Sequence, residues 1–317
     1  MKYSFVIPCY RSERTIRSVV QELIAEIEKE QLTDYEIILV NDCSPDGVWK
    51  VIRELAQEYS FLNGINLARN FGQHAALLAG YAKTTGDIII SLDDDGQAPI
   101  DELYKLLDEL NNDKDVVYAY FDEIKQTGFR RFGTYVATRM SQLLLGAPKD
   151  FKGSSFYVAK RFVINEMLRY NNAYPYLLGL VLRTTRKIGC VKTNHRSRLA
   201  GTSGYNLKSL FSLWLNGFTA FSVKPLELGA LLGVIFAVIG FIIVIVTVVR
   251  KLCNPTVAVG WTSIISVILI VGGILLLMLG LIGEYVGRIY ICLNKSPQYV
   301  VREDTFTADS DPVEERQ

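Results

Sequence analysis

Short apolar segments alternate with amphipathic segments along the first part of the chain. The apolar segments are rich in β-branched residues and predict buried strands, while the segments between them carry apolar residues at helical spacing. Strands are expected at residues 3–10, 35–42, 62–68, 87–95 and 115–121, and helices at 12–30, 46–59 and 72–85. Apolar strands that alternate with helices are typical of a parallel sheet covered on both faces. The pattern therefore predicts an α/β fold with a mostly parallel central sheet.

The middle of the chain is less regular. Residues 123–146 read as a polar loop leading into an amphipathic helix, and further strands are expected at 151–160 and 188–195. Residues 206–225 are amphipathic and aromatic. This pattern is typical of a juxtamembrane helix that lies along a membrane surface, and an ordinary packing helix is the alternative.

Two long segments, 228–249 and 261–283, contain no charged residue. Each exceeds the roughly 20 residues that cross the hydrocarbon core of a bilayer. Helices of soluble proteins rarely stay apolar on all sides over such a length. The chain is therefore predicted to have two transmembrane helices.

Two spans place both ends of the chain on the same side of the membrane. Positive charges flank the pair at Lys208, Lys224, Arg288, Lys295 and Arg302, against Arg250 and Lys251 in the connection. This excess favours a cytosolic location for both ends, and the N-terminus lacks the layout of a signal peptide. We expect a multi-pass protein of the plasma (inner) membrane, with a cytosolic catalytic domain at 1–205, the amphipathic segment at 206–225, a transmembrane domain at 226–287 and a cytosolic tail at 288–317. The acidic end of the tail, from Glu303, is expected to be disordered.

Composition excludes several classes of function. The chain carries 34 Lys and Arg against 33 Asp and Glu, a net charge of +1, so no basic field points to nucleic acid. Its five cysteines are scattered without a CxxC pair, which argues against structural zinc.

Three consecutive aspartates, Asp93, Asp94 and Asp95, stand at the end of the strand expected at 87–95. Like charges repel, and a cation would offset the repulsion. Carboxylate oxygens suit Mg²⁺ or Mn²⁺, which bind one or two carboxylates together with substrate phosphates. In an extended stretch Asp93 and Asp95 would point together, with Gln97 continuing the alternation and Asp94 pointing away. This predicts a metal–diphosphate site, with a solvated acidic turn as the alternative.

Other polar residues fall at neighbouring strand ends. Ligands of such sheets bind at the carboxyl ends of the strands, where Pro8, Tyr10 and Asp42 also lie. Asp42 can accept a hydrogen bond from a base or a ribose hydroxyl, or it can form an Asx turn or a helix cap. No G-x-G-x-x-G follows the first strand, so a dinucleotide fold of the usual kind is not supported.

Five segments carry a family resemblance: VIPCYRSERTI, ILVNDCSPDG, RNFGQHAALLAGYAKTTGDIIISLDDDGQ, HRSRLAGTSGY and GLIGEYVGRIY. Through them the chain resembles the family 2 glycosyltransferases of the GT-A fold, from about residue 3 to 302. It is more closely similar to the polyprenyl-phosphate glycosyltransferases, which include dolichol-phosphate mannose synthases and bacterial undecaprenyl-phosphate glucosyl- and aminoarabinose transferases.

The resemblance implies a role for each matching residue. On the donor side, Pro8, Tyr10 and Glu13 would frame the nucleotide pocket, Asp42 would contact uracil or ribose, and Asp94 and Gln97 would lie beside Asp93 and Asp95, which hold the metal and the donor diphosphate. On the acceptor side, Arg130 and Arg131 would meet the acceptor phosphate or the leaving diphosphate, and Arg198, Ser203 and Tyr205 would form a second phosphate-binding segment. Asp93, Asp95, Arg130 and Arg198 would be the catalytic residues. The chain departs from the family in reading YRSE, which moves a carboxylate to Glu13, and in carrying Ser154 and Ser155 where some relatives have an aspartate.

The resemblance also implies the reaction. A sugar on a nucleotide donor, expected to be UDP, would be displaced with inversion by the phosphate oxygen of a polyprenyl (undecaprenyl) phosphate, for modification of a cell-envelope glycan. Mg²⁺ or Mn²⁺ would be the cofactor, and related enzymes suggest a homo-oligomer. The alternatives are a transferase with a glycolipid or polysaccharide acceptor, and a non-catalytic membrane protein that retains the fold.

Overall fold

The computed structural model describes residues 1–121, 151–173, 175–194, 260–294 and 296–306, together with residues 142 and 148 and isolated positions between 226 and 249. The chain divides into two compact units. The first contains Met1–Gly217 and Lys295–Gln317, and the second is Phe218–Asn294. The described residues 296–306 thus belong to the first unit.

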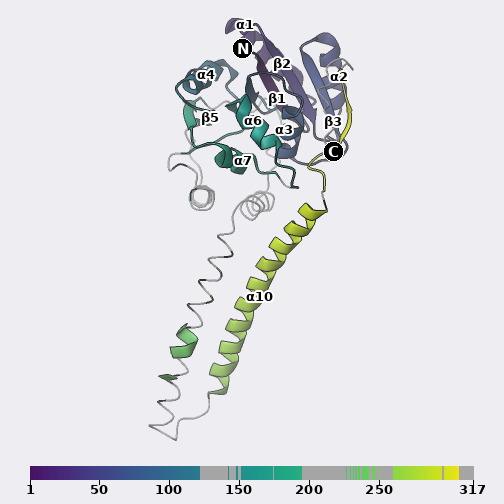
Figure 1. Cartoon of the computed structure of the whole chain (residues 1–317). Helices are drawn as coiled ribbons and strands as arrows, with labels where there is room; N and C mark the ends of the chain where they lie inside the picture. Colours follow the sequence, from purple (N-terminus) through teal and green to yellow (C-terminus); the bar gives the residue numbers. More distant parts are fainter. Residues whose placement is uncertain are drawn as a thin grey trace. The chain divides into compact units, whose positions relative to one another are not determined.

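An eight-stranded sheet forms the centre of the first unit (Figure 1). Its strands in the described residues are β1 (Tyr3–Cys9), β2 (Tyr35–Asn41), β3 (Leu62–Leu67), β4 (Ile88–Ser91), β5 (Val116–Phe121), β6 (Tyr157–Lys160), β7 (Ile188–Thr193) and β8 (Val301–Asp304). Their order across the sheet is β7-β5-β6-β4-β1-β2-β3-β8.

The sheet is mostly parallel, which confirms the prediction from the apolar pattern. Strands β4, β1, β2 and β3 run parallel to one another, and β5 runs parallel to β7. Strand β6 is antiparallel to both β4 and β5, and β8 is antiparallel to β3. The central strands are buried on both faces, since every β1 residue from Ser4 to Cys9 is buried.

Helices cover both faces of this sheet (Figure 1). They are α1 (Ile16–Lys29), α2 (Val48–Glu58), α3 (Gln73–Tyr81), the 3-10 turn η1 (Ile100–Glu102), α4 (Leu103–Asn111), α6 (Arg161–Leu168) and α7 (Leu177–Thr184). One core cluster joins α1, α2 and α4 to Phe5 and Ile7 of β1. On the other face α3 approaches Val6 and Val40 so closely that a Cβ on Gly80 would lie 2.4 Å from Val6 Cγ1.

The first residues of the segment expected to be disordered, 303–306, are ordered, while 307–317 lie outside the described residues. Val301–Asp304 form strand β8, which pairs with β3 and forms the edge of the sheet. Backbone hydrogen bonds continue past the strand, because Thr305 N donates to the Gly64 carbonyl at 3.0 Å. An acidic, apolar-poor segment can still be ordered when an unpaired strand edge offers it backbone partners.

The second unit contains the long helix α10 (Trp261–Leu293), of 33 residues (Figure 1). Among the described residues, one stretch, Val271–Leu293, is long and apolar enough to cross a membrane, with a mean hydropathy of 1.7. Side chains such as Ile268, Leu276 and Leu279 are more than 60% exposed. The second predicted span, 261–283, therefore lies within one continuous helix. The described positions of the first predicted span are helical, but they are not continuous, so a second spanning helix stays a prediction.

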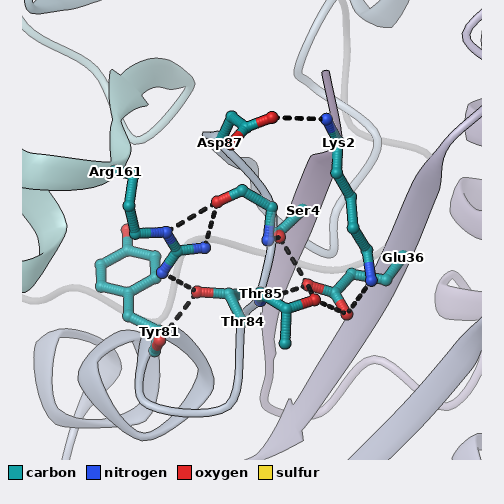
Figure 2. A network of polar contacts seen from close by, with 9 residues as sticks. Lys2, Ser4, Glu36, Tyr81, Thr84, Thr85, Asp87 and Arg161 are labelled. Atoms are coloured by element: carbon teal, nitrogen blue, oxygen red, sulfur yellow. Dashed lines mark hydrogen bonds and ion pairs between the residues drawn. The ribbon is translucent and has the colours of Figure 1, made fainter.

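A polar network closes the end of the sheet where the central strands begin (Figure 2). Glu36, the second residue of β2, accepts hydrogen bonds from Ser4 Oγ at 2.6 Å and from the Thr85 N–H at 2.6 Å, and its carboxylate lies 3.4 Å from Lys2 Nζ. Arg161, the first residue of α6, donates to the Gly86 carbonyl through Nε at 2.7 Å. These contacts join β1, β2, α6 and the turn between α3 and β4.

The Glu36 carboxylate is expected to stabilise the fold in a pH-dependent way. Burial by itself would raise the pKa of Glu36, but the hydrogen bonds from Ser4 and Thr85 and the charge of Lys2 outweigh it, so the pKa lies below its ordinary value of 4.5. A lowered pKa means that the ionised form stabilises the folded state above the ordinary value, and that this stabilisation is lost as the pH falls through the lowered value. Glu36→Gln should lower the free energy of unfolding by about 1–2 kcal/mol at neutral pH.

Thermal unfolding of Glu36→Gln and of the parent chain should therefore converge as the pH falls below 4.5, the ordinary pKa. Glu28→Gln, at an exposed position of α1, is the matched control and should follow the parent at every pH. A difference between Glu36→Gln and the parent that stays constant with pH would contradict the assigned role.

Candidate functional site

The carboxyl ends of the central strands gather the predicted site residues at one edge of the sheet. Cys9 of β1 pairs with Asn41 of β2, and Val6 of β1 pairs with Ser91 of β4. Because these strands are parallel, the residues that follow them emerge at the same edge. Tyr10, Asp42 and the three aspartates therefore come together in space from three separate parts of the sequence.

Asp93 is held by side chains from two further elements. Its Oδ1 accepts a hydrogen bond from Gln73 Nε2 at 2.7 Å, and its Oδ2 accepts one from Ser155 Oγ. Gln73 is the first residue of α3, and Ser155 stands just before β6. Both partners are neutral donors, so they fix the carboxylate without cancelling its charge. Sequence reasoning did not find this role for Gln73 or Ser155, because neither is close to Asp93 along the chain.

Asp94 points to a different partner. Its Oδ2 accepts a hydrogen bond from the Tyr10 N–H at 2.8 Å, and its carbonyl accepts one from Thr15 Oγ1 at 2.7 Å. Burial raises the pKa of the Asp94 carboxyl to about 6, and the charges of Asp93 and Asp95 add to the rise. Asp94 therefore ties the end of β4 to the end of β1.

Asp95 lies in a turn and not in an extended strand. Strand β4 ends at Ser91, so the expected strand over 87–95 is too long at its end. Asp95 Oδ1 accepts the Gln97 N–H at 3.0 Å around Gly96, whose φ is 73°. The prediction that Asp94 points apart from Asp93 agrees with their contacts, but strand alternation is not the reason.

Two carboxylates at this turn suit a hard cation. Across the described ranges, no group of three or more His, Cys, Asp and Glu side chains could hold a metal ion. Mg²⁺ and Mn²⁺ do not need such a group, because they take one or two carboxylates and complete their coordination with water and substrate phosphates. Asp93 and Asp95 supply carboxylate oxygens of the kind that such an ion takes, and their assignment to a metal stays a prediction.

Asp42 organises the loop between β3 and α3. The residue is 3% exposed, and its two carboxylate oxygens accept the N–H groups of Phe71 at 2.7 Å and Gly72 at 2.8 Å. Burial raises the pKa of Asp42, and the two backbone hydrogen bonds partly offset the rise. The described contacts of its side chain are thus with backbone, and a contact with uracil or ribose stays a prediction.

Glu13 is directed to the start of α2. Its Oε2 accepts the Gly47 N–H at 3.0 Å, and a Cβ on Gly47 would lie 2.5 Å from Glu13 Oε1. A carboxylate near the N-terminus of a helix stabilises the unpaired N–H groups there. The described contact of Glu13 is therefore structural, whereas the family resemblance assigned it to the nucleotide pocket.

The first loop of the site is formed by residues after β1. Pro8 is buried within β1 opposite Val40, while Tyr10 is 44% exposed and lies under the Arg11 guanidinium, 5.5 Å from the ring centre. Arg11 has a φ of 58°, in the left-handed region. Tyr10 is thus the exposed aromatic side chain of this part of the site.

The acceptor-side predictions cannot be placed. Arg130, Arg131, Arg198, Ser203 and Tyr205 lie outside the described residues, as does the loop and helix expected at 123–146. Ser154, the neighbour of Ser155, donates to the Ala119 carbonyl of β5 at 2.8 Å.

Comparison with known proteins identifies the family to which a chain with this sheet and these acidic strand ends belongs. The profile of the family described as Glycosyl transferase family 2 matches residues 4–168, which is more than half of the chain. The chain belongs to this family and is a glycosyltransferase. A second profile, described as the GtrB C-terminal hairpin, matches residues 224–289.

Relatives of nearly equal length sharpen this assignment. The chain is 32% identical over 306 residues to an uncharacterized glycosyltransferase, YkcC, of Bacillus subtilis, covering 96% of this chain and 94% of the relative. It is 30% identical over 316 residues to the undecaprenyl-phosphate 4-deoxy-4-formamido-L-arabinose transferase of Aeromonas hydrophila, covering 98% and 96%. These relatives agree with the resemblance to polyprenyl-phosphate glycosyltransferases.

Solved structures confirm the fold. Glucosyl-3-phosphoglycerate synthase from Mycobacterium tuberculosis, in complex with Mn²⁺ and UDP-glucose, aligns with a TM-score of 0.52 at 20% identity, covering 69% of this chain and 77% of that one. A complex of the same enzyme with Mn²⁺, UDP and phosphoglyceric acid aligns with a TM-score of 0.51 at 20% identity, covering 68% and 75%. The GT-A fold with a mostly parallel sheet, expected from the sequence, is therefore confirmed.

Proposed function

We propose that the protein transfers a sugar from a UDP-linked donor to undecaprenyl phosphate at the cytosolic face of the membrane. The observation that carries the proposal is the Asp93 carboxylate at the sheet edge, which accepts hydrogen bonds from Gln73 and Ser155. Asp95 follows two residues later in the same turn. A negative site that is rigid and held by neutral donors is suited to a divalent ion bridging a diphosphate.

The donor and the ion are supported by the fold neighbours. The mycobacterial enzyme of the same fold binds UDP-glucose together with Mn²⁺. In this chain Asp93 and Asp95 would hold Mg²⁺ or Mn²⁺, which when bound supplies positive charge beside the departing diphosphate. Tyr10 and the loops that Asp42 and Asp94 fix would surround the nucleotide, with Pro8, Glu13 and Gln97 as neighbouring positions.

The acceptor is supported by the relatives. The Aeromonas relative is an undecaprenyl-phosphate sugar transferase that matches almost the whole chain. A phosphate acceptor is already ionised at neutral pH, so its oxygen can attack the anomeric carbon without a strong general base. The reaction is then a single displacement with inversion, and Arg130, Arg131, Arg198 and Ser203 would bind the acceptor phosphate.

A membrane location follows from this acceptor. The exposed apolar surface of α10 and the match of 224–289 to a C-terminal hairpin support two spanning helices at about 228–249 and 261–283. The segment at 206–225 would lie along the membrane surface, so that the site meets a headgroup whose tail stays in the bilayer. The resemblance to the polyprenyl-phosphate glycosyltransferases further suggests that the protein forms a homo-oligomer.

The test is a transfer assay with the full chain in membranes or detergent. A panel of UDP-sugars is incubated with undecaprenyl phosphate, with and without Mn²⁺ or Mg²⁺, and the lipid-linked product is followed by chromatography. We expect a metal-dependent product from one of these donors, with inverted anomeric configuration. A product that forms only with a glycolipid or polysaccharide acceptor would support the alternative acceptor class, and the absence of donor turnover under every condition would refute the proposal.

A further inference from the structure

We propose that Glu303, in the strand that follows the long apolar helix, is a positioning residue for the loops after β1 and β2. The part of this inference that concerns nucleotide binding rests on the proposed function, while its structural part stands without it. The role would make the C-terminal return strand a component of the donor site.

A directional chain of hydrogen bonds joins Glu303 to the loop after β2. Glu303 Oε1 accepts from Asn66 Nδ2 at 2.9 Å, and Asn66 Oδ1 accepts from Asn41 Nδ2 at 2.8 Å. Asn41 Oδ1 in turn accepts the Ser44 N–H at 3.0 Å. The side-chain amides of Asn66 and Asn41 each donate a hydrogen bond in the direction of β8 and accept one from the direction of the loop after β2. The three hydrogen bonds therefore depend on one another.

Burial explains why this chain needs a terminal acceptor. Asn41 is 3% exposed and Asn66 is 7% exposed. A buried amide without a partner is costly, and Asn66 Nδ2 donates to Glu303 across the pairing of β3 with β8. Glu303 thus completes a side-chain network that crosses three neighbouring strands, from β8 through β3 to β2.

The far end of the chain fixes two strained backbone positions. Ser44 Oγ accepts the Arg11 N–H at 2.7 Å and donates to Asp46 Oδ1 at 2.6 Å. Arg11 has a φ of 58° and Cys43, which precedes Ser44, has a φ of 49°. Left-handed conformations at residues with a side chain are unfavourable and persist where surrounding contacts hold them. Tyr10, the exposed aromatic residue of the site, directly precedes Arg11.

The return strand is held chiefly by polar contacts. The Ala68 N–H donates to the Val300 carbonyl at 2.8 Å, and the Gly64 N–H donates to Thr305 Oγ1 at 2.8 Å. Gln298 Nε2 donates to the Asn172 carbonyl at 2.9 Å. All four residues of β8 are exposed, so little apolar burial contributes to its docking. A strand attached in this way can position the loops after β1 and β2 through Glu303. Alternatively, its role can be limited to covering the edge of β3.

Three variants of the full chain separate these two roles. Glu303→Ala removes the acceptor, Glu303→Gln keeps an oxygen that can accept from Asn66, and Arg302→Ala alters an exposed neighbour on the same strand. Two properties are measured: hydrogen exchange of the backbone N–H groups of Ser44 and Arg11, and the binding of UDP in the presence of Mn²⁺.

In Glu303→Ala we expect the exchange of Ser44 and Arg11 to accelerate about tenfold, the effect of losing one hydrogen bond to a charged group. The apparent Kd for UDP should rise by a similar factor, and in the transfer assay KM for the donor should change more than kcat. Glu303→Gln should restore both properties, and Arg302→Ala should match the parent.

Unchanged exchange at Ser44 and Arg11 in Glu303→Ala, with β8 still protected, would overturn the inference. If β8 itself loses protection, Asn66→Leu breaks the same network from within β3, and unchanged exchange at Ser44 in that variant would overturn it equally. If the parent chain binds no UDP, the proposed function fails, but the exchange comparison still decides the positioning role.

Discussion

Asp95→Ala is expected to abolish sugar transfer to lipid phosphate, with a loss of about a thousandfold or more in the rate. Asp95 supplies one of the two carboxylates of the candidate metal site, and its turn is fixed locally by the hydrogen bond from the Gln97 N–H. Alanine removes charge at the point where the diphosphate would separate, while the contacts that Asp93 makes with Gln73 and Ser155 stay in place.

The measurement compares initial transfer rates and Mn²⁺ binding for the purified variant. Asp108→Ala, at an exposed position of α4, removes an equal charge away from the strand ends and should retain the parent rate. Membrane insertion of both variants should be unchanged, since neither residue belongs to an apolar span. Activity that survives in Asp95→Ala would refute the assignment of the metal site.

Gly86→Ala is expected to destabilise the first unit by about 3 kcal/mol, at the upper end of the range for overpacking. A Cβ at this position would lie 2.5 Å from Ser4 Oγ, 2.8 Å from the Lys2 carbonyl oxygen and 2.9 Å from the Ser4 backbone nitrogen. Two of these atoms belong to the backbone of β1 and its approach, so they cannot move without disturbing the central sheet.

The substitution would also disturb the polar network around Glu36 and Arg161, because the Gly86 N–H donates to Ser4 Oγ at 2.9 Å and the Gly86 carbonyl accepts from Arg161 Nε at 2.7 Å. Thermal and denaturant unfolding of the detergent-solubilised chain would measure the effect. Gly189→Ala is the control, because its nearest neighbours are side-chain carbons at 3.2–3.3 Å that can yield by a few tenths of an ångström. Equal unfolding midpoints for the two variants would show that the close approach of Gly86 to β1 does not exclude a side chain at this position.

The local pattern of the chain predicted the sheet well because burial imposes it directly. A strand buried on both faces must be apolar throughout, and a helix that covers a sheet must carry an apolar face. Ile37–Val40 and the buried positions of α1 could therefore be recognised from the sequence. Helices α4, α6 and α7 were not predicted, since their segments are short and their flanks irregular.

The grouping of polar residues at one edge of the sheet was predicted for a related reason, while their roles stay predictions. Parallel strands end at one edge, so strand ends that are far apart in sequence could be grouped as Tyr10, Asp42 and Asp93 without knowing the strand order. The partners of these residues could not be found in the same way. Gln73 and Ser155 reach Asp93 from 20 and 62 residues away, and Glu13 and Asp42 are engaged by Gly47, Phe71 and Gly72. Such pairings depend on side-chain directions and on loop conformation.

By itself, therefore, the sequence determined the α/β class, the mostly parallel sheet, the acidic edge and the family, because each depends on residue type and spacing along the chain. Only the tertiary structure decided that Asp94 joins β4 to β1, and that Glu303 belongs to an ordered strand. The physical reason is that both results depend on which polar atoms fall within hydrogen-bond distance after folding. An acidic segment next to an unpaired strand edge finds partners there that its composition alone does not reveal.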